Sequence, residues 1–302
     1  MANKKFSQAV SDVLNNLIEV IEKELEVILK AQPTGKLVDD MQSILDELKR
    51  RASFPDTKTL RDLPIGAKVV DKNTKYYGVP IVWLVADHDY YAPSLTTLVS
   101  EHILTFKAFD ASEPKNPDEG RVEFGNNDYK ISNIAQWLNS YGDNWFTPLH
   151  TYDKAPALGY VSSRPYANES GFLTNFSKDF VQSMKDSLLS RVFLLSDEEV
   201  GLADGKQLAL FENEEYRKAK PTKECIQIDN LGVDENKPNW WWLRTPSIKC
   251  SHYTRCVNAY GEIRTRSAYY GYGGVRPALN RPSEICVKAE PDENDVYEII
   301  WS

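Results

Sequence analysis

Three consecutive tryptophans, Trp240, Trp241 and Trp242, place the strongest constraint on how this chain can fold. Each indole carries roughly 200 Å² of surface, most of it apolar, so exposing all three would be costly. Side chains alternate between the two faces of a strand, so neighbouring tryptophans are both buried only where both faces are covered. The run therefore predicts a central strand with at least two of the three tryptophans buried.

The composition allows such a strand to lie inside a substantial core. The chain has 302 residues, of which 41% are hydrophobic and 26% charged, which predicts one large or two smaller folded domains. A net charge of -8 argues against nucleic-acid binding, because neutralising phosphates needs an excess of Lys and Arg. Asp12, Asn15 and Asn16 interrupt the N-terminal apolar residues. We therefore expect cytoplasmic synthesis without a signal peptide, and no membrane span.

Residues 1–54 are predicted to form an amphipathic helical hairpin. Apolar residues recur at steps of three and four in both helices, and the first helix is expected over residues 6–30. The two stripes are Val10, Leu14, Leu17, Ile21, Leu25 and Ile28, then Leu37, Met41, Ile44, Leu45 and Leu48. Pro33 and Gly35 predict the turn between the helices, and Phe54-Pro55-Asp56 predicts the boundary. Such a hairpin has more apolar surface than two helices can bury, so it either self-associates or docks elsewhere.

The rest of the chain has the pattern of an α+β domain with many short strands. Ser132 is a candidate N-cap for a short helix, and a second helix is predicted over residues 178–189. A polar loop is expected over residues 110–129. Strands are predicted at 67–70, 79–86, within 98–109, and at 191–195, 285–288 and 296–301.

The segment from Ser247 to Gly274 has an unusual composition. It holds five tyrosines with Ser, Thr, His, Arg and Gly between them, and it follows neither a strand's alternation nor a helix's stripe. Antibody binding loops have this composition, because Tyr gives large contacts at low entropy cost. Between Trp240 and Asn280, six basic residues stand against Glu262 alone, a local charge of +5. We therefore expect an irregular, positively charged ligand-binding segment here.

Short motifs around this segment resemble a known family. They are Trp241-Trp242-Leu243-Arg244-Thr245-Pro246, Val257-Asn258-Ala259-Tyr260-Gly261, Gly273-Gly274-Val275-Arg276-Pro277-Ala278-Leu279-Asn280, Ile134-Ala135-Gln136-Trp137-Leu138-Asn139 and Val192-Phe193-Leu194-Leu195-Ser196. Together they resemble the C-type-lectin-like (formylglycine-generating-enzyme-like) domain recurrent in bacteriophage and prophage proteins. The resemblance covers roughly Leu60 to Ile285. It implies a lectin-like domain over 60–302, with Trp241, Trp242, Arg244, Gly274 and Arg276 as scaffold.

Members of that family include the variable proteins of diversity-generating retroelements, such as phage tropism determinants. In those systems, adenines of a template copy are mutated, so Asn codons are converted into codons for other residues. Lys249 and Glu262 are not reachable from Asn codons in this way, and we assign them to the scaffold. The resemblance implies a variable region at about 247–274, whose reachable residues are candidate ligand contacts. These are Ile248, Cys250, His252, Tyr253, Thr254, Cys256, Tyr260, Ile263, Arg264, Thr265, Arg266, Ser267, Tyr269, Tyr270 and Tyr272.

The resemblance implies a receptor-recognition protein and not an enzyme. The expected partner is a bacterial surface receptor, either a protein or an acidic polymer. The chain would be made in the bacterial cytoplasm and carried on the virion. There it would form a homo-oligomer, most plausibly a trimer, or dock onto a tail or baseplate component.

Two alternatives stay open. One is a lectin-like binder without diversification. The other is an oxidase of the formylglycine-generating kind, whose copper-binding cysteine pair would correspond to Cys250 and Cys256. No cofactor or metal is expected under the preferred interpretation. The motifs Glu-Pro-Asn and Trp-Asn-Asp of calcium-dependent lectins do not occur, and Glu113-Pro114-Lys115 departs from the first at its last position.

Overall fold

The computed structural model describes residues 2–30, 36–53, 57–186, 190–229 and 232–301. The chain divides into two compact units. The first comprises residues 1–58 with 288–290, and the second comprises 59–287 with 291–302. The turn expected at 31–35 and the boundary expected at 54–56 lie outside the described residues. None of the described helices has the length and apolar character needed to cross a membrane.

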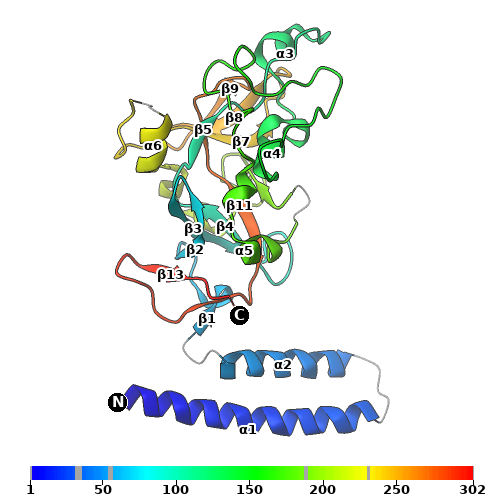
Figure 1. Ribbon diagram of the computed structural model, residues 1–302, viewed down its shortest axis with the longest axis vertical. Helices are drawn as coiled ribbons and strands as arrows, with labels where there is room; N and C mark the ends of the chain where they lie inside the picture. Colours follow the sequence, from blue (N-terminus) through cyan, green and yellow to red (C-terminus); the bar gives the residue numbers. More distant parts are fainter. Residues whose placement is uncertain (1, 31–35, 54–56, 187–189, 230–231, 302) are drawn as a thin grey trace. The chain divides into compact units, whose positions relative to one another are not determined.

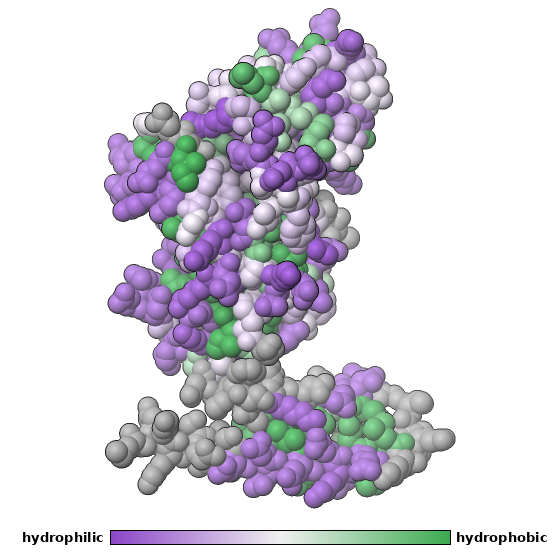
Figure 2. All heavy atoms as spheres, in the orientation of Figure 1, coloured by the Kyte–Doolittle hydropathy of each residue, from purple (hydrophilic) through white to green (hydrophobic). Residues whose placement is uncertain are grey.

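The first unit contains two helices, α1 (Ala2–Lys30) and α2 (Lys36–Ser53). Ile18 and Leu25 of α1 and Leu45 of α2 are buried, with Ile21, Met41 and Leu48 packed around them. Leu17 was predicted on this stripe, but it is 44% exposed. Ile18 takes its place, because steps of three and four through Ile21 and Leu25 keep the contacts on one seam. Apolar side chains that stay exposed include Val13, Leu17, Val20, Val27 and Ile44. Figure 2 shows apolar patches among the charged side chains of this unit.

The second unit has the α+β character predicted from the sequence, with many strands and few helices (Figure 1). One sheet has the order β13-β2-β3-β4-β11-β6. Its strands are β13 (Val296–Glu298), β2 (Lys68–Tyr76), β3 (Val79–His88), β4 (Leu95–Ser100), β11 (Ala278–Pro282) and β6 (Val192–Phe193). The other has the order β5-β10-β7-β8-β9. Its strands are β5 (Thr105–Lys107), β10 (Gly273–Val275), β7 (Trp241–Pro246), β8 (Tyr253–Val257) and β9 (Ile263–Ser267). Two more short strands are β1 (Thr57–Thr59) and β12 (Cys286–Lys288).

The helices of this unit are short. They are α3 (Glu119–Phe124), α4 (Asn133–Leu138), α5 (Lys178–Gln182) and α6 (Lys223–Asp229), with 3-10 turns at Leu60–Asp62, Tyr129–Ile131, Phe172–Asn175, Ala209–Glu212 and Glu214–Arg217. Ser132 caps α4 as predicted, since its hydroxyl accepts a hydrogen bond from the backbone N–H of Ala135. The helix predicted over 178–189 ends at Gln182. Ser183 follows, and its hydroxyl donates to the carbonyls of Asp179 and Phe180, which is how Ser competes with helical hydrogen bonding.

Trp241 and Trp242 lie on β7, between β10 and β8 in the middle of the five-stranded sheet, and Trp240 directly precedes the strand. Trp241 and Trp242 are fully buried and Trp240 is half-buried, which confirms the predicted burial of at least two. Both buried indoles donate their N–H to backbone carbonyls. Trp241 bonds Arg217 at 2.9 Å and Trp242 bonds Lys107 at 2.8 Å. Neither ring therefore leaves a polar atom unsatisfied in the core.

A buried ion pair fixes the far half of β7. The two terminal nitrogens of Arg244 each lie 2.5 Å from a carboxylate oxygen of Glu199, and one also donates to the carbonyl of Leu194. The Glu199 side chain is 4% exposed and also accepts from the Tyr91 hydroxyl. A planar guanidinium matches a carboxylate in this two-point geometry, which a Lys ammonium does not reproduce.

We expect Arg244→Met to lower the free energy of unfolding by about 3 kcal/mol, because it leaves the Glu199 carboxylate desolvated and unpaired. Arg244→Lys restores the charge without the two-point contact and should give a smaller loss. Adding Glu199→Gln to Arg244→Met removes the unpaired charge and should recover part of the stability. Urea unfolding of the four proteins measures these differences. A stability of Arg244→Met equal to that of the parent would contradict the structural role.

Candidate ligand-binding face

The segment 247–274 is more regular than its composition suggested. β8 and β9 form an antiparallel hairpin in which Tyr253 pairs with Ser267 and Val257 with Ile263. β9 is the last strand of its sheet, so it has one neighbour and no partner on its outer edge among the described strands. Arg264, Thr265 and Arg266 are all exposed. The expected irregular loop is therefore wrong for these strands. An edge strand exposed on both faces carries no apolar alternation that a sequence pattern could report.

Most of the reachable side chains lie at the surface of this hairpin and the loops beside it. Ile248 and Tyr260 are 90% and 79% exposed. The exposed group comprises Ile248, Tyr253, Tyr260, Arg264, Thr265, Arg266, Tyr270 and Tyr272. The half-buried group comprises Cys250, His252, Ile263, Ser267 and Tyr269. We call these thirteen residues together the hairpin face. In Figure 1, β8 and β9 lie at one end of the second unit, near α3.

Thr254 and Cys256 do not belong to this face, and their prediction as ligand contacts is wrong. Both are buried under neighbouring strands and loops. The Thr254 hydroxyl donates to the carbonyl oxygens of Leu243, at 3.2 Å, and Thr245, at 3.1 Å. It therefore has a structural role in joining β8 to β7. Burial raises the pKa of the Cys256 thiol to about 12.

Helix α3 supports the half-buried part of the face. The Phe124 ring lies 5.3 Å from the ring of His252 and 5.4 Å from that of Tyr269, measured between centroids. Gly120 makes room for His252, because a Cβ at this position would lie 2.2 Å from the imidazole Nδ1. The Ser251 hydroxyl bonds the Asp118 carboxylate that caps α3. The loop before β8 is thus attached to this helix.

Asn127 fixes the backbone of the same loop, a role that no sequence motif indicated. Its side-chain nitrogen donates to the carbonyls of Ser247, Cys250 and Tyr253, at 3.3, 2.8 and 2.8 Å. Its backbone N–H donates to the carbonyl of Ser251 at 3.0 Å. Every bond goes to main-chain oxygen, so Asn127 shapes the loop whatever side chains the loop carries.

The glycines of the Gly273-Gly274-Val275-Arg276 motif let β10 approach the tryptophans. A Cβ at Gly273 would lie 1.9 Å from the indole nitrogen of Trp242, and one at Gly274 would lie 2.7 Å from the carbonyl of Trp240. The Arg276 guanidinium is buried, donates to the carbonyls of Ser100 and Tyr216, and lies over the Trp241 ring at 5.1 Å. Burial lowers its pKa to about 9.

Two other motif asparagines join separate elements through their amides. Asn139, at the end of α4, exchanges hydrogen bonds with the backbone of Val192 in β6, at 2.8 and 3.0 Å. Asn280 of β11 accepts from the hydroxyl of Thr97 in β4 at 2.8 Å. The motifs spread along the chain therefore meet as contacts of a single framework.

The charges of the hairpin face differ in how they are paired. Arg264 contacts Glu262 at 2.7 Å, and both side chains are exposed. The Arg266 guanidinium lies over the half-buried Trp240 ring, 5.8 Å from its centroid. Arg255, on β8, pairs with the buried carboxylate of Asp197 and is thereby held in the scaffold. Arg264 and Arg266 are the exposed cations of β9.

Glu113, in the motif that departs from the calcium-lectin pattern, is not on this face. Its side chain is fully buried, lies 3.2 Å from Nε2 of His150, and accepts from Asn116. Burial is the main cause that raises its pKa. Within the described ranges, no group of three or more His, Cys, Asp or Glu side chains has an arrangement suited to a metal ion.

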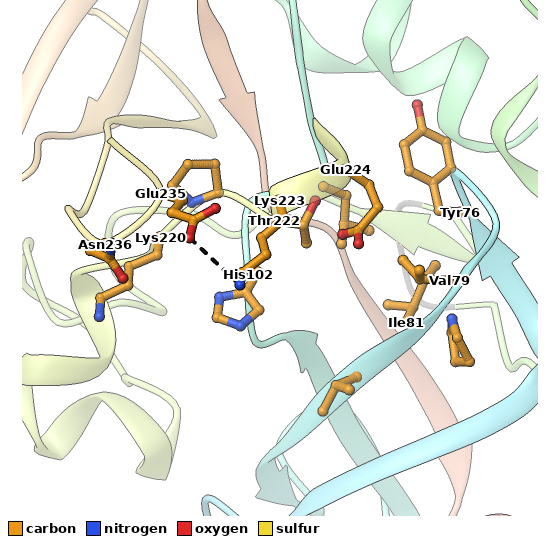
Figure 3. Close-up of a pocket in the computed structure, with 14 residues that line it drawn as sticks. Tyr76, Val79, Ile81, His102, Lys220, Thr222, Lys223, Glu224, Glu235 and Asn236 are labelled. Carbon is orange, nitrogen blue, oxygen red and sulfur yellow. Dashed lines mark ion pairs between the residues drawn. The ribbon is translucent and has the colours of Figure 1, made fainter. Parts of the chain in front are cut away.

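A separate cavity of about 380 Å³ lies between β3 and the segment that leads into α6 (Figure 3). Val79 and Ile81 form part of an apolar wall, and Lys223 pairs with Glu235 at 3.5 Å across the opening. Burial lowers the pKa of His102, which lies beside this pair. Sequence reasoning did not identify this cavity, because its lining comes from distant segments without a shared motif.

The fold and this face define an α+β protein with an exposed, Tyr- and Arg-rich edge hairpin on a tryptophan-anchored sheet. The chain belongs to the family described as "Domain of unknown function (DUF6273)", whose model matches residues 94–283. That match takes in the whole five-stranded sheet, strands β4, β11 and β6 of the six-stranded sheet, and the whole hairpin face. No curated protein and no solved structure matches the chain.

We expect Asn127→Asp to lower the free energy of unfolding by about 2 kcal/mol or more at pH 7, because a carboxylate cannot donate to the three carbonyls. Asn127→Ala, the control, loses the same bonds without adding a charge and should cost less. A carboxyl that faces carbonyl oxygens has its pKa raised on folding. The loss of folding stability caused by ionising it is therefore absent below its unfolded-state pKa of about 4, and it grows as the pH rises above that value. Urea unfolding between pH 4.5 and 7 should show the two variants diverging. Parallel pH profiles would contradict the assigned geometry.

Proposed function

We propose that this protein is a diversified receptor-recognition protein of a phage or prophage, with a C-type-lectin-like scaffold that presents the hairpin face to a bacterial surface receptor. The observation that carries the proposal is the exposure of β9. Arg264, Thr265 and Arg266 are consecutive residues, all are exposed, and all are reachable from Asn codons by changes at adenines. Consecutive exposed residues in a strand allow replacement of neighbours without a cavity or a clash in the core.

The separation between buried scaffold side chains and exposed reachable side chains supports the same proposal. Residues that the motifs assign to the scaffold make buried contacts, such as Trp242 beneath Gly273 and Arg276 beside Trp241. Lys249 and Glu262, which are not reachable from Asn codons, are exposed, so they do not contribute to this buried scaffold. Thirteen of the fifteen reachable residues lie at least partly at the surface. Aromatic and Arg side chains dominate protein interfaces energetically, so a few such anchors suffice for recognition.

Thr254 and Cys256 limit the extent of the variable surface. Their burial places them with the scaffold in this proposal, so replacement there would disturb β7 and β8. The ligand would be a protein or an acidic polymer, in keeping with Arg264 and Arg266 on the exposed strand.

The proposed function includes self-association through the helical hairpin. Val13, Leu17, Val20 and Val27 of α1 are 44–67% exposed after α1 and α2 have packed. Their spacing of four, three and seven residues forms a second seam, separate from that of Ile18 and Leu25. A trimer on a phage tail would multiply the hairpin faces, and linked sites raise effective concentration when single contacts are weak.

The genomic neighbourhood tests diversification directly. We expect a near-identical copy of the DNA that encodes Trp240 to Asn280, beside a reverse-transcriptase gene. The two copies should differ only where the template copy has adenines, and those differences should fall in codons of the hairpin face, sparing Trp242. Genome sequencing of the source and its near relatives measures this. Differences that ignore adenine positions would overturn diversification and leave a lectin-like binder with a fixed face.

Self-association is tested by Val20→Glu, which places a charge in the exposed seam of α1. We expect the parent protein to be an oligomer and Val20→Glu to shift it toward the monomer, because burying an unpaired carboxylate in a helical interface is unfavourable. Asn15→Glu, the matched control, adds the same charge at an exposed position outside the seam and should leave the mass unchanged. Light scattering during size exclusion gives the molar mass. A monomeric parent protein would exclude self-association.

A further inference from the structure

The outer edge of β9 carries a ladder of main-chain groups that point away from β8. The N–H of Asn258 bonds the carbonyl of Glu262, and the N–H of Ala268 bonds the carbonyl of His252. Hydrogen-bonded and non-hydrogen-bonded pairs alternate along an antiparallel ladder. Arg264 and Arg266 therefore bond β8, while the N–H and C=O groups of Ile263 and Thr265 point outward.

Two guanidinium groups donate to the outward-pointing carbonyls of this ladder. Arg264 donates to the carbonyl of Ile263 at 2.8 Å, and Arg266 donates to the carbonyl of Thr265 at 3.1 Å. Both arginine side chains are exposed, so these bonds exchange readily with water or with a ligand. Among the strands described by the structure, only β8 pairs with β9. The outward N–H of Thr265 lies in the middle of this accessible edge.

We propose that the edge of β9 binds an extended, acidic peptide segment of a protein receptor by strand addition. This inference rests on the proposed function and assigns the ligand of the hairpin face to the protein class. A peptide backbone presents N–H and C=O groups at every second residue along one side, a spacing of roughly 6.8 Å that matches Ile263 and Thr265. Acidic residues in that segment complement Arg264 and Arg266.

Strand addition also explains how one face could retain affinity while its side chains change. The ladder of β9 belongs to the main chain and is present whatever residues occupy positions 263–267, apart from proline. Main-chain hydrogen bonds then supply a constant part of the affinity, and the exposed side chains on both faces of β9 select the sequence bound. Diversification would alter specificity without rebuilding the site.

The test uses a library of random linear peptides panned on the full-length protein, followed by synthesis of one selected peptide with a fluorescent label. Thr265→Pro removes the outward N–H without removing a bond to β8, and proline is tolerated on strand edges that face solvent. Thr265→Ala, the matched control, keeps the N–H. We expect Thr265→Pro to weaken peptide binding by about tenfold or more and Thr265→Ala by about twofold or less.

A second measurement leaves the protein unchanged and covers the case in which Thr265→Pro disturbs folding. N-methylation of the labelled peptide, one residue at a time, should weaken binding at alternate residues only, because only every second N–H faces β9.

The possible outcomes distinguish strand addition from recognition by the side chains of the hairpin face alone. Selection of acidic peptides together with both expected effects supports strand addition. If Arg264→Ser and Arg266→Ser weaken binding but Thr265→Pro equals Thr265→Ala and N-methylation shows no alternation, strand addition is wrong and side-chain recognition by the hairpin face stands. Failure to select any peptide that competes at this face likewise overturns strand addition. The genomic test of diversification is independent of all these results.

Discussion

The burial of Trp241 and Trp242 on opposite faces of β7 is the constraint on which the rest of the second unit depends. Each indole is fully buried and bonds a backbone carbonyl, so both faces of the sheet must be covered at this strand. Truncating a buried tryptophan typically costs about 3–5 kcal/mol, which makes the position of β7 one of the least adjustable features of the domain. β8 pairs with this fixed strand, and β9 pairs with β8.

Burial decreases outward across the sheet, from β7 to the exposed edge strand β9. β8 is intermediate, with Thr254 and Cys256 facing the interior and Tyr253 facing solvent. The loop before β8 is held by main-chain contacts from Asn127 and by attachment to α3. The Asn127 bonds go to main-chain oxygen, so this part of the support stays when side chains of the loop are replaced. The Ser251–Asp118 bond and the packing of His252 and Tyr269 on Phe124 depend on the side chains present.

The sequence predicted the features that depend on local patterns. The tryptophan run indicated a strand buried on both faces, and Ser132 indicated a helix cap, because both signals reside in adjacent residues. The β8–β9 hairpin was missed because an edge strand exposed on both faces has no apolar period. The burial of Thr254 and Cys256 follows from pairing with β7, and the role of Asn127 follows from a loop more than a hundred residues away in the chain. Such long-range relations leave no mark in a single sequence.

The open edge of β9 imposes an opposing constraint. A strand edge with unpaired main-chain groups can pair with copies of itself, and natural proteins counter this with charged residues on the edge. Arg264 and Arg266 fit that role, because their guanidinium groups occupy the carbonyls of Ile263 and Thr265 and repel the same groups on another copy. Both positions belong to the reachable set, so replacing these arginines with apolar residues would change recognition and self-pairing together. Positions 264 and 266 are exposed and can be replaced without disturbing the core. Apolar replacements there would favour pairing of one copy with another, so solubility limits which residues these positions can hold.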